Sequence, residues 1–379
     1  MLIFVCLSKN PTASWQMTID FIDIYEYTNI WYHVLLAVTL VTFVHTQTIR
    51  LQEPKLKSYI AFAGGTLLIF TLVYIGLRPV HGVFVDMTTY ARGFRSYAAG
   101  REVTANRDVL FQLFTKFSAT WLTIEVYFFL IACAYVIPLY VVSKKWFKDY
   151  WFYGFLLFVG SFSFWQYGTN GMRNGIAGSL FLLGISRDKR VFQVIWLIIA
   201  INIHRSMLLP VVGYAATHFY NKPKAYYGFW LACIPLSLVL PGLWEGLLGG
   251  LVSDDRASSY LGEEDMAGSV NVGFRWDFLF YSSFGVFAGW YYIFKKKLKD
   301  DFYVRLYNTY LVANGFWILV IRANFTNRFA YLSWFFMALI IAYPWAKYNF
   351  IKKQHQLFGW VMLAYVGFTY AMQFIYYAQ

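Results

Sequence analysis

Charged residues are scarce in this sequence. They make up 13% of its 379 residues, whereas about 25% is usual for a soluble domain. Hydrophobic residues account for 59% of the chain and aromatic residues for 22%. Because Trp and Tyr gather at the headgroup level of bilayers, this composition excludes an ordinary soluble domain and indicates a protein that crosses the membrane several times.

Cysteine is also rare, and its positions form no binding pattern. Cys6, Cys133 and Cys233 have no CxxC spacing, so neither a disulfide framework nor a zinc site is expected. HExxH, GxSxG, Walker, EF-hand and DxD-like motifs are missing from suitable contexts, and we therefore predict no metal and no cofactor. No small-residue cleavage site follows a short apolar start, so a removable signal peptide is not expected. Translation is expected to start at Met1 or at Met17.

Long apolar runs fill most of the chain. A helix needs about 20 apolar residues to cross a bilayer, and about twelve runs approach that length. We predict an all-α, polytopic membrane protein with a single transmembrane domain over residues 1–379 and both termini on the non-cytoplasmic side. The predicted spans are 29–46, 57–77, 121–143, 150–168, 172–186, 190–204, 206–220, 226–250, 276–294, 304–321, 329–346 and 358–377, of which the fifth to seventh are short for a full crossing.

Lysine and arginine divide between two sets of loops when these spans alternate across the bilayer. One set holds fifteen lysines and three arginines, the clustered charge typical of cytoplasmic loops. The net charge of +13 is therefore attributed to membrane electrostatics and not to nucleic-acid binding. The other set holds two lysines and eleven arginines, namely Arg78, Arg92, Arg95, Arg101, Arg107, Arg173, Arg205, Arg256, Arg275, Arg322 and Arg328. Guanidinium is the planar partner of phosphate and carboxylate, so we predict a non-cytoplasmic surface that handles an anionic substrate.

Two loops on the arginine-rich side are long. Residues 78–120 contain two segments with apolar residues at three- and four-residue steps, which predict amphipathic helices at the outer interface. Residues 251–275 form an acidic, polar loop that we expect to be mobile. In the first loop, Asp86 and Tyr90 share one helical face. Asp108 opens the second segment, where capping of that helix is an equally good interpretation.

His204 and Arg205 interrupt an apolar stretch that otherwise runs from Val191 to Ala216. Ionisable groups at such a position are costly and tend to be functional, and histidine can accept or donate a proton near neutral pH. The alternative is a tight interfacial turn from which Arg205 reaches the headgroups.

Arg173 falls in the first turn of a predicted helix that follows an Asn170–Gly171 turn. The amino terminus of a helix already favours anions, and an arginine there strengthens the site. Gly175 and Gly178 would let a ligand or another backbone approach closely. The alternative is a helix-packing glycine pair beside an interfacial arginine.

Arg322 and Arg328 flank a polar turn that contains Asn324 and Asn327. Two guanidinium groups and two amides suit a phosphate or sugar hydroxyls. The alternative is a loop that caps two helices.

Taken in order, these segments resemble the EpsG family of Wzy-type polysaccharide polymerases, over about residues 80–335. Asp108 stands where the family has a glutamate, and Asn174 where glutamine is commoner. The matching features are D-x-x-x-Y (Asp86, Tyr90), an acidic residue before an amphipathic segment (Asp108 to Phe117), an arginine-bearing helix start (Arg173, Asn174, Ala177), His-x-Ser (His204, Ser206) and a late Asn/Arg/Tyr run (Asn327, Arg328, Tyr331).

The resemblance implies a GT-C-like glycosyltransferase in the plasma (inner) membrane of a bacterium. It would join undecaprenyl-pyrophosphate-linked oligosaccharide repeat units at the outer face. The expected base is His204, or else Asp86. The predicted ligands of the pyrophosphate and sugars are Arg173, Arg205, Arg328, Arg322, Tyr90, Asn174, Asn327 and Asp108. Membrane lipids, a chain-length regulator and a flippase are the expected partners.

Three other functions fit parts of the pattern. An O-antigen ligase would use the same lipid donor, and a multi-pass acyltransferase would also need an intramembrane histidine and arginines. A transporter of lipid-linked oligosaccharides would be expected to have paired repeats and broken helices at the midplane, and the sequence shows neither.

Overall fold

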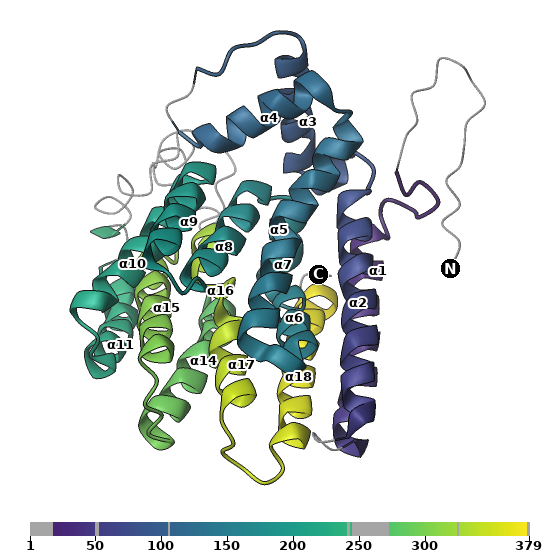
Figure 1. The fold of residues 1–379 in the computed structure, drawn as a ribbon. Helices are drawn as coiled ribbons and strands as arrows, with labels where there is room; N and C mark the ends of the chain where they lie inside the picture. Colours follow the sequence, from purple (N-terminus) through teal and green to yellow (C-terminus); the bar gives the residue numbers. More distant parts are fainter. Residues whose placement is uncertain are drawn as a thin grey trace.

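The chain folds into a bundle of helices. In the computed structural model (Figure 1), residues 18–49, 53–104, 107–240, 243–244, 273–323 and 326–376 are described, and this part of the chain contains helices and no strand. The predicted all-α class is therefore confirmed. The acidic loop predicted at 251–275 lies almost wholly outside the described residues.

The helices follow one another with short connections. The first part comprises α1 (Tyr27–Thr48), α2 (Pro54–Gly76), α3 (Asp86–Ala98), α4 (Val109–Trp121), α5 (Ile124–Phe147), α6 (Trp151–Val159) and α7 (Phe162–Thr169). The second part comprises α8 (Met172–Ile185), α9 (Arg190–Ile203), α10 (Leu208–Phe219), α11 (Pro223–Val239), α14 (Trp276–Trp290), α15 (Asp301–Leu319), α16 (Thr326–Trp334), α17 (Met337–Lys347) and α18 (Gln354–Ala371).

Within the described ranges, five helical segments are long and apolar enough to cross a membrane. This agrees with a polytopic membrane protein, but it does not confirm the predicted count of twelve. Helices α8 and α9 have 14 residues each and are apolar but short. The five segments are Tyr27–Thr48, Lys55–Gly76, Ile124–Val159, Thr326–Lys347 and Gln354–Ile375.

Two predicted spans are not continuous helices. The run 150–168 breaks at Gly160–Ser161, between α6 and α7, and the run 329–346 breaks at Phe335–Phe336, between α16 and α17. Neither break was predicted from the sequence. Hydropathy misses both breaks because the residues at each break are small or apolar and leave the window average high.

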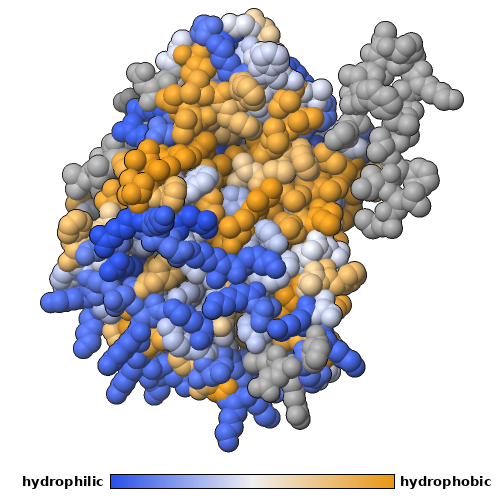
Figure 2. All heavy atoms as spheres, viewed as in Figure 1, coloured by the Kyte–Doolittle hydropathy of each residue, from blue (hydrophilic) through white to orange (hydrophobic). Residues whose placement is uncertain are grey.

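The lysine-bearing loops gather at one end of the bundle. Ion pairs join three of them to neighbouring segments: Lys57 with Asp149 at 3.5 Å, Lys145 with Asp188 at 2.7 Å, and Lys347 with Asp300 at 2.8 Å. The loops α14–α15 and α17–α18 lie at the lower end in Figure 1, where Figure 2 shows mostly hydrophilic residues. A hydrophobic zone covers the upper part of the same face, and α3 and α4 lie at the opposite end from the lysines.

The predicted amphipathic segments of the first long loop are the helices α3 and α4. On α3, Met87, Ala91 and Phe94 are buried. On α4, Phe117 and Trp121 are 63% and 72% exposed, so one apolar stripe faces away from the bundle. This arrangement fits helices that lie at a membrane interface.

A buried amide connects several helices in the second half of the bundle by hydrogen bonds. Asn314 Oδ1 on α15 accepts a hydrogen bond from Trp230 Nε1 on α11 at 2.7 Å. Its Nδ2 donates to Ser282 Oγ on α14 and to Ser333 Oγ on α16 at 3.0 and 2.9 Å. Trp334 Nε1 also donates to Ser282. Four helices therefore meet at hydrogen-bonded groups in the apolar core, where an unpaired polar group is costly.

Candidate functional site

The Asp108 carboxylate contacts a guanidinium, an imidazole and a backbone N–H group from two other segments. Arg173 Nη1, on the first turn of α8, lies 2.6 Å from Oδ2. His204 Nδ1, at the carboxyl end of α9, lies 3.4 Å from the same oxygen, which is longer than a well-formed hydrogen bond. The backbone N–H of Arg205 donates to Oδ1 at 2.9 Å. We call these four residues the Asp108 cluster.

Asp108 does not act as a cap, although it occupies the position before α4. Its side chain makes no capping hydrogen bond, and its φ of 51° is left-handed, a conformation that Asp tolerates better than most residues. The carboxylate is thus turned away from its own helix and towards α8 and α9. The interpretation of Asp108 as a helix cap is therefore not supported.

The surroundings of Asp108 favour its ionised form. The side chain is 8% exposed, and this burial alone would raise the pKa of the carboxyl. The neighbouring His204 ring, the Arg173 guanidinium and the Arg205 N–H outweigh burial, so the pKa of Asp108 falls below its ordinary value. A carboxylate that accepts several N–H contacts behaves in this way.

The polypeptide around His204 changes direction in the middle of the apolar run. Helix α9 ends at Ile203, His204 is extended, and a single 3-10 turn over Arg205–Met207 leads into α10. The predicted turn is therefore present, and it also places the His204 side chain next to Asp108. This side chain is 12% exposed. The Arg205 side chain is exposed, so only its backbone joins the cluster.

The first turn of α8 carries two further predicted residues. Asn174 Oδ1 accepts a hydrogen bond from Ser206 Oγ at 2.8 Å, which ties α8 to the 3-10 turn beside His204. The Arg173 guanidinium lies 5.9 Å from the centre of the Tyr90 ring on α3, within reach of a cation–π contact. Gly175 serves packing: a Cβ there would meet the Tyr167 carbonyl at 2.9 Å, so the close neighbour is backbone.

Asp86 and Arg328 form a second group. Arg328 Nη2 on α16 lies 3.5 Å from Asp86 Oδ2 at the start of α3. Asn170 Oδ1 accepts from the backbone N–H of Asp86 at 3.1 Å. Asn327 Nδ2 donates to Tyr331 Oη at 3.3 Å, at the limit of a hydrogen bond. We call Asp86, Asn170, Asn327, Arg328 and Tyr331 the Asp86 cluster.

One turn connects the two clusters. Asn170 and Gly171 link α7 to α8, with Asn170 bound to Asp86 on one side and Arg173 bound to Asp108 on the other. The sequence marked Asn170 only as a turn residue, and its role in holding Asp86 was missed. An Asn-Gly pair directly before an arginine-bearing helix was the available signal.

Several predicted residues stay outside both clusters. No contact among the described residues joins Arg322 to either cluster, and its Nε is buried without a hydrogen-bond partner. Asn324 and Arg256 lie outside the described residues. Arg92, Arg95 and Arg101 are exposed, which suits contact with headgroups or solvent.

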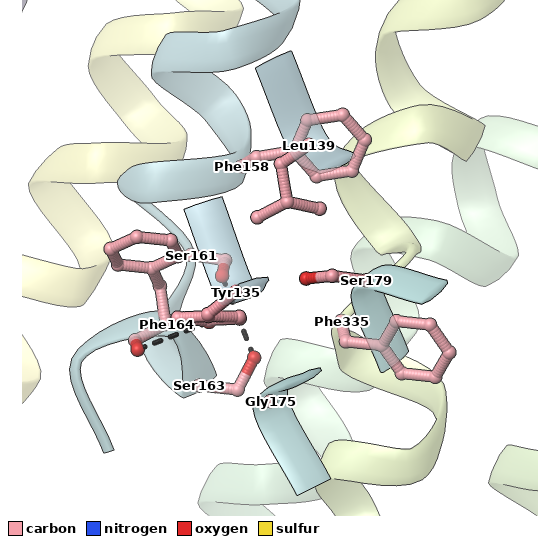
Figure 3. Close-up of a pocket in the computed structure, with 9 residues that line it drawn as sticks. All are labelled: Tyr135, Leu139, Phe158, Ser161, Ser163, Phe164, Gly175, Ser179 and Phe335. Atoms are coloured by element: carbon pink, nitrogen blue, oxygen red, sulfur yellow. Dashed lines mark hydrogen bonds between the residues drawn. The ribbon is translucent and has the colours of Figure 1, made fainter. Parts of the chain in front are cut away.

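A separate small cavity lies where the two broken helices meet (Figure 3). Its lining comes from the α6–α7 break, α5, α8 and Phe335 of the α16–α17 break. Three serine hydroxyls, from Ser161, Ser163 and Ser179, face it, and the free space is about 10 Å³, close to the minimum for one water molecule. The lining contains no charged residue, so this cavity does not suit an anion.

Comparison with known proteins identifies a family. The model of a protein family described as the EpsG family matches residues 63–379, a range that contains every residue of both clusters. No curated protein and no solved structure matches the chain.

Proposed function

Because it matches that family model over most of its length, the chain belongs to the EpsG family, membrane proteins linked to polysaccharide biosynthesis, and we propose that it is a glycosyltransferase of the Wzy type. It joins lipid-pyrophosphate-linked oligosaccharide repeat units at the outer face of the plasma membrane of a bacterium. The observation that carries the proposal is the Asp108 cluster, in which one buried carboxylate orients both an imidazole and a guanidinium.

The reaction needs a base and a cation. The acceptor hydroxyl oxygen bonds to the anomeric carbon of the donor while the bond from that carbon to the pyrophosphate oxygen breaks. The electron pair departs with the pyrophosphate, and the hydroxyl proton goes to the base. Preorganised cations stabilise the charge that develops on the leaving group.

His204 is the proposed base. Asp108 faces Nδ1 of its ring, so Nε2 is the nitrogen that accepts the proton, and the carboxylate stabilises the imidazolium that results. Asp86 was the other candidate, but the contact of its carboxylate with Arg328 suits a positioning role better.

Arg173 and Arg328 are the proposed ligands of the pyrophosphate. Each is oriented by a carboxylate, Asp108 and Asp86 respectively, and the Asn170 turn connects the two. Asn174, Asn327 and Tyr90 are proposed to contact the sugars or phosphates. Arg205 reaches a headgroup or the lipid-linked substrate from its exposed position, and Arg322 keeps only a supporting role.

The broken helices favour one competing function. Unwound segments at membrane depth are typical of transporters, where they line the substrate path. In this chain the breaks surround a cavity with room for about one water molecule, and the charged groups lie elsewhere. Because this cavity is too small for an oligosaccharide, a transporter of lipid-linked oligosaccharides is the second candidate and not the first.

Purified protein in liposomes, supplied with lipid-linked repeat unit, tests the proposal. The native chain and Arg92→Gln, an exposed arginine of α3, should give a ladder of polymers on a gel. His204→Gln and Arg173→Gln should give only the unextended substrate. A chelator arm tests the prediction that no metal is needed. A normal ladder from well-folded His204→Gln rejects the base assignment, and movement of labelled lipid across the bilayer without elongation favours the transporter.

The same liposomes separate the remaining rivals. Addition of a lipid A core acceptor should not change the ladder if the chain is a polymerase, whereas transfer of one unit to that core identifies a ligase. Transfer of labelled acetyl groups identifies an acyltransferase.

A further inference from the structure

Arg78 is a buried guanidinium outside both clusters. It follows α2 in the chain and is only 2% exposed. Its Nη1 donates to the carbonyl of Ile75, its Nη2 reaches the carbonyl of Thr169 at 3.5 Å and the sulfur of Met172 at 3.3 Å, and its Nε has no hydrogen-bond partner. Among the described residues, no carboxylate pairs with it. An uncompensated buried charge is strongly destabilising, so the burial of this guanidinium calls for a physical reason.

Two helix ends take the place of the missing carboxylate. Ile75 lies in the last turn of α2, and Thr169 is the last residue of α7. The final carbonyls of a helix have no partner within the helix and carry partial negative charge. The face of the Phe84 ring, 5.4 Å from the guanidinium carbon, adds a cation–π contact. Arg78 is thus held by two helix carboxyl termini and an aromatic ring.

The contacts of Arg78 bracket the turn that connects the two clusters. Thr169 directly precedes Asn170, and Met172 directly precedes Arg173. The guanidinium therefore touches the turn on both of its sides, from within the protein, while Asn170 and Arg173 face Asp86 and Asp108. A change in the position of this turn would move both clusters.

We propose that Arg78 is a positioning residue that fixes the α7–α8 turn and thereby sets the Asp86 and Asp108 clusters relative to each other. Lysine at this position would keep the charge but would lack the planar fork that reaches two carbonyls. Methionine would keep much of the volume and lose the charge. The catalytic consequence rests on the proposed function, whereas the geometric consequence does not.

A cross-linking experiment measures the position of the α7–α8 turn relative to the start of α3, and it does not depend on activity. Cysteines replace Asp86 and Asn170, the natural cysteines are changed to alanine, and a short bis-thiosulfonate reagent bridges the pair. With Arg78 present the bridge should form in high yield. Arg78→Met should lower the yield at least about threefold and Arg78→Lys should give an intermediate yield, whereas Arg92→Met, the matched surface control, should change nothing. Equal yields in all four proteins overturn the proposal.

The liposome assay supplies the second measurement, on proteins with Asp86 and Asn170 intact. A misplacement of about 1 Å can cost 100-fold in rate, so Arg78→Met should lower turnover at saturating substrate by about 10- to 100-fold, with partial rescue by Arg78→Lys. If Arg78→Met does not reach the membrane folded, Arg78→Lys alone tests the proposal. A native cross-linking yield together with a native turnover in Arg78→Lys would overturn it. A lowered cross-linking yield in a chain that makes no polymer under any condition would support the positioning role and refute the proposed function.

Discussion

At the scale of single residues, Asp108 determines how the candidate site is assembled. Its carboxylate is buried, carries charge and holds Arg173, His204 and the N–H of Arg205. Removal of the charge would break the ion pair with Arg173 and remove a carboxylate that orients the His204 imidazole. Both consequences fall on groups proposed to act in catalysis.

Asp108→Asn is therefore expected to lower the rate of polymer formation by about 10- to 100-fold. Asn tolerates the left-handed backbone at this position, so the backbone should persist while the charge is lost. Laddering in the liposome assay measures the effect. The matched control is Asp149→Asn, which removes an exposed ion pair at the opposite end and should change little, since such pairs contribute about 0–1 kcal/mol. An Asp108→Asn protein as active as the native chain would contradict the role.

The lowered pKa of Asp108 sets a pH dependence. Because the pKa in the folded protein lies below the unfolded value, the carboxylate stabilises the fold at pH values above the unfolded pKa, and this contribution is lost only as pH falls through the folded pKa. The difference in Tm between the native chain and Asp108→Asn should thus persist from about pH 7 to 5 and shrink below about pH 4. Thermal unfolding in detergent measures it. A difference that has already vanished at pH 5 would refute the ion pairs.

The residues of the site were largely predictable, but their pairing was not. His204 was identified because an ionisable group inside an apolar stretch is costly. Arg173 was identified from its place in the first turn of a predicted helix, and Asp86 from the helical face that it shares with Tyr90. Asp108 lies 65 residues from Arg173 and 97 from Arg205 along the chain. No local spacing rule joins positions so far apart. Because Asp108 directly precedes a helix, it could also be interpreted as a helix cap.

At the scale of helices, the Asn314 hydrogen bonds join α11, α14, α15 and α16. Each donor and acceptor is buried in an apolar bundle, where water cannot replace a lost partner. The amide therefore acts as a shared attachment point whose removal leaves Trp230 and the two serines with fewer partners.

Asn314→Ala is expected to destabilise the fold by about 1–3 kcal/mol, seen as a lower Tm in detergent. Asn202→Ala is the matched control, because among the described residues the Asn202 amide bonds only the Ile198 carbonyl of its own helix and should cost much less. Equal losses for the two changes would show that the four-helix hydrogen bonds add nothing to stability.

Helix existence was easier to predict than helix continuity. Apolar runs of the right length located the segments that became α1, α2 and α18, because hydropathy responds to composition. The breaks at Gly160–Ser161 and Phe335–Phe336 depend on which neighbours pack there; for example, the Phe162 N–H bonds Tyr281 Oη at 3.1 Å. Such tertiary partners lie more than a hundred residues away and leave no mark in a sliding window.

At the scale of the whole molecule, lysine and the clusters lie at opposite ends of the bundle. If the lysine end is cytoplasmic, as clustered lysine predicts, cysteines placed at exposed Thr89 on α3 and exposed Lys353 before α18 should react from different sides. In a background without natural cysteines, a membrane-impermeant maleimide applied to intact cells should label Thr89→Cys and spare Lys353→Cys. Permeabilised cells provide the control, in which both should react. Labelling of Lys353→Cys alone in intact cells would invert the proposed orientation.

The length of α9 has a consequence for where the chemistry takes place. Its 14 residues rise about 21 Å, less than the roughly 30 Å of bilayer hydrocarbon. If α9 starts at the inner hydrocarbon boundary, where Arg187 and Lys189 precede it, then His204 sits several ångströms beneath the level of the outer phosphates. Sugars would then have to enter below the level of the outer phosphates to react. The exposed stripe of α4 would take the place of acyl chains above α9. On the proposed function, local thinning of the outer leaflet would therefore accompany the reaction.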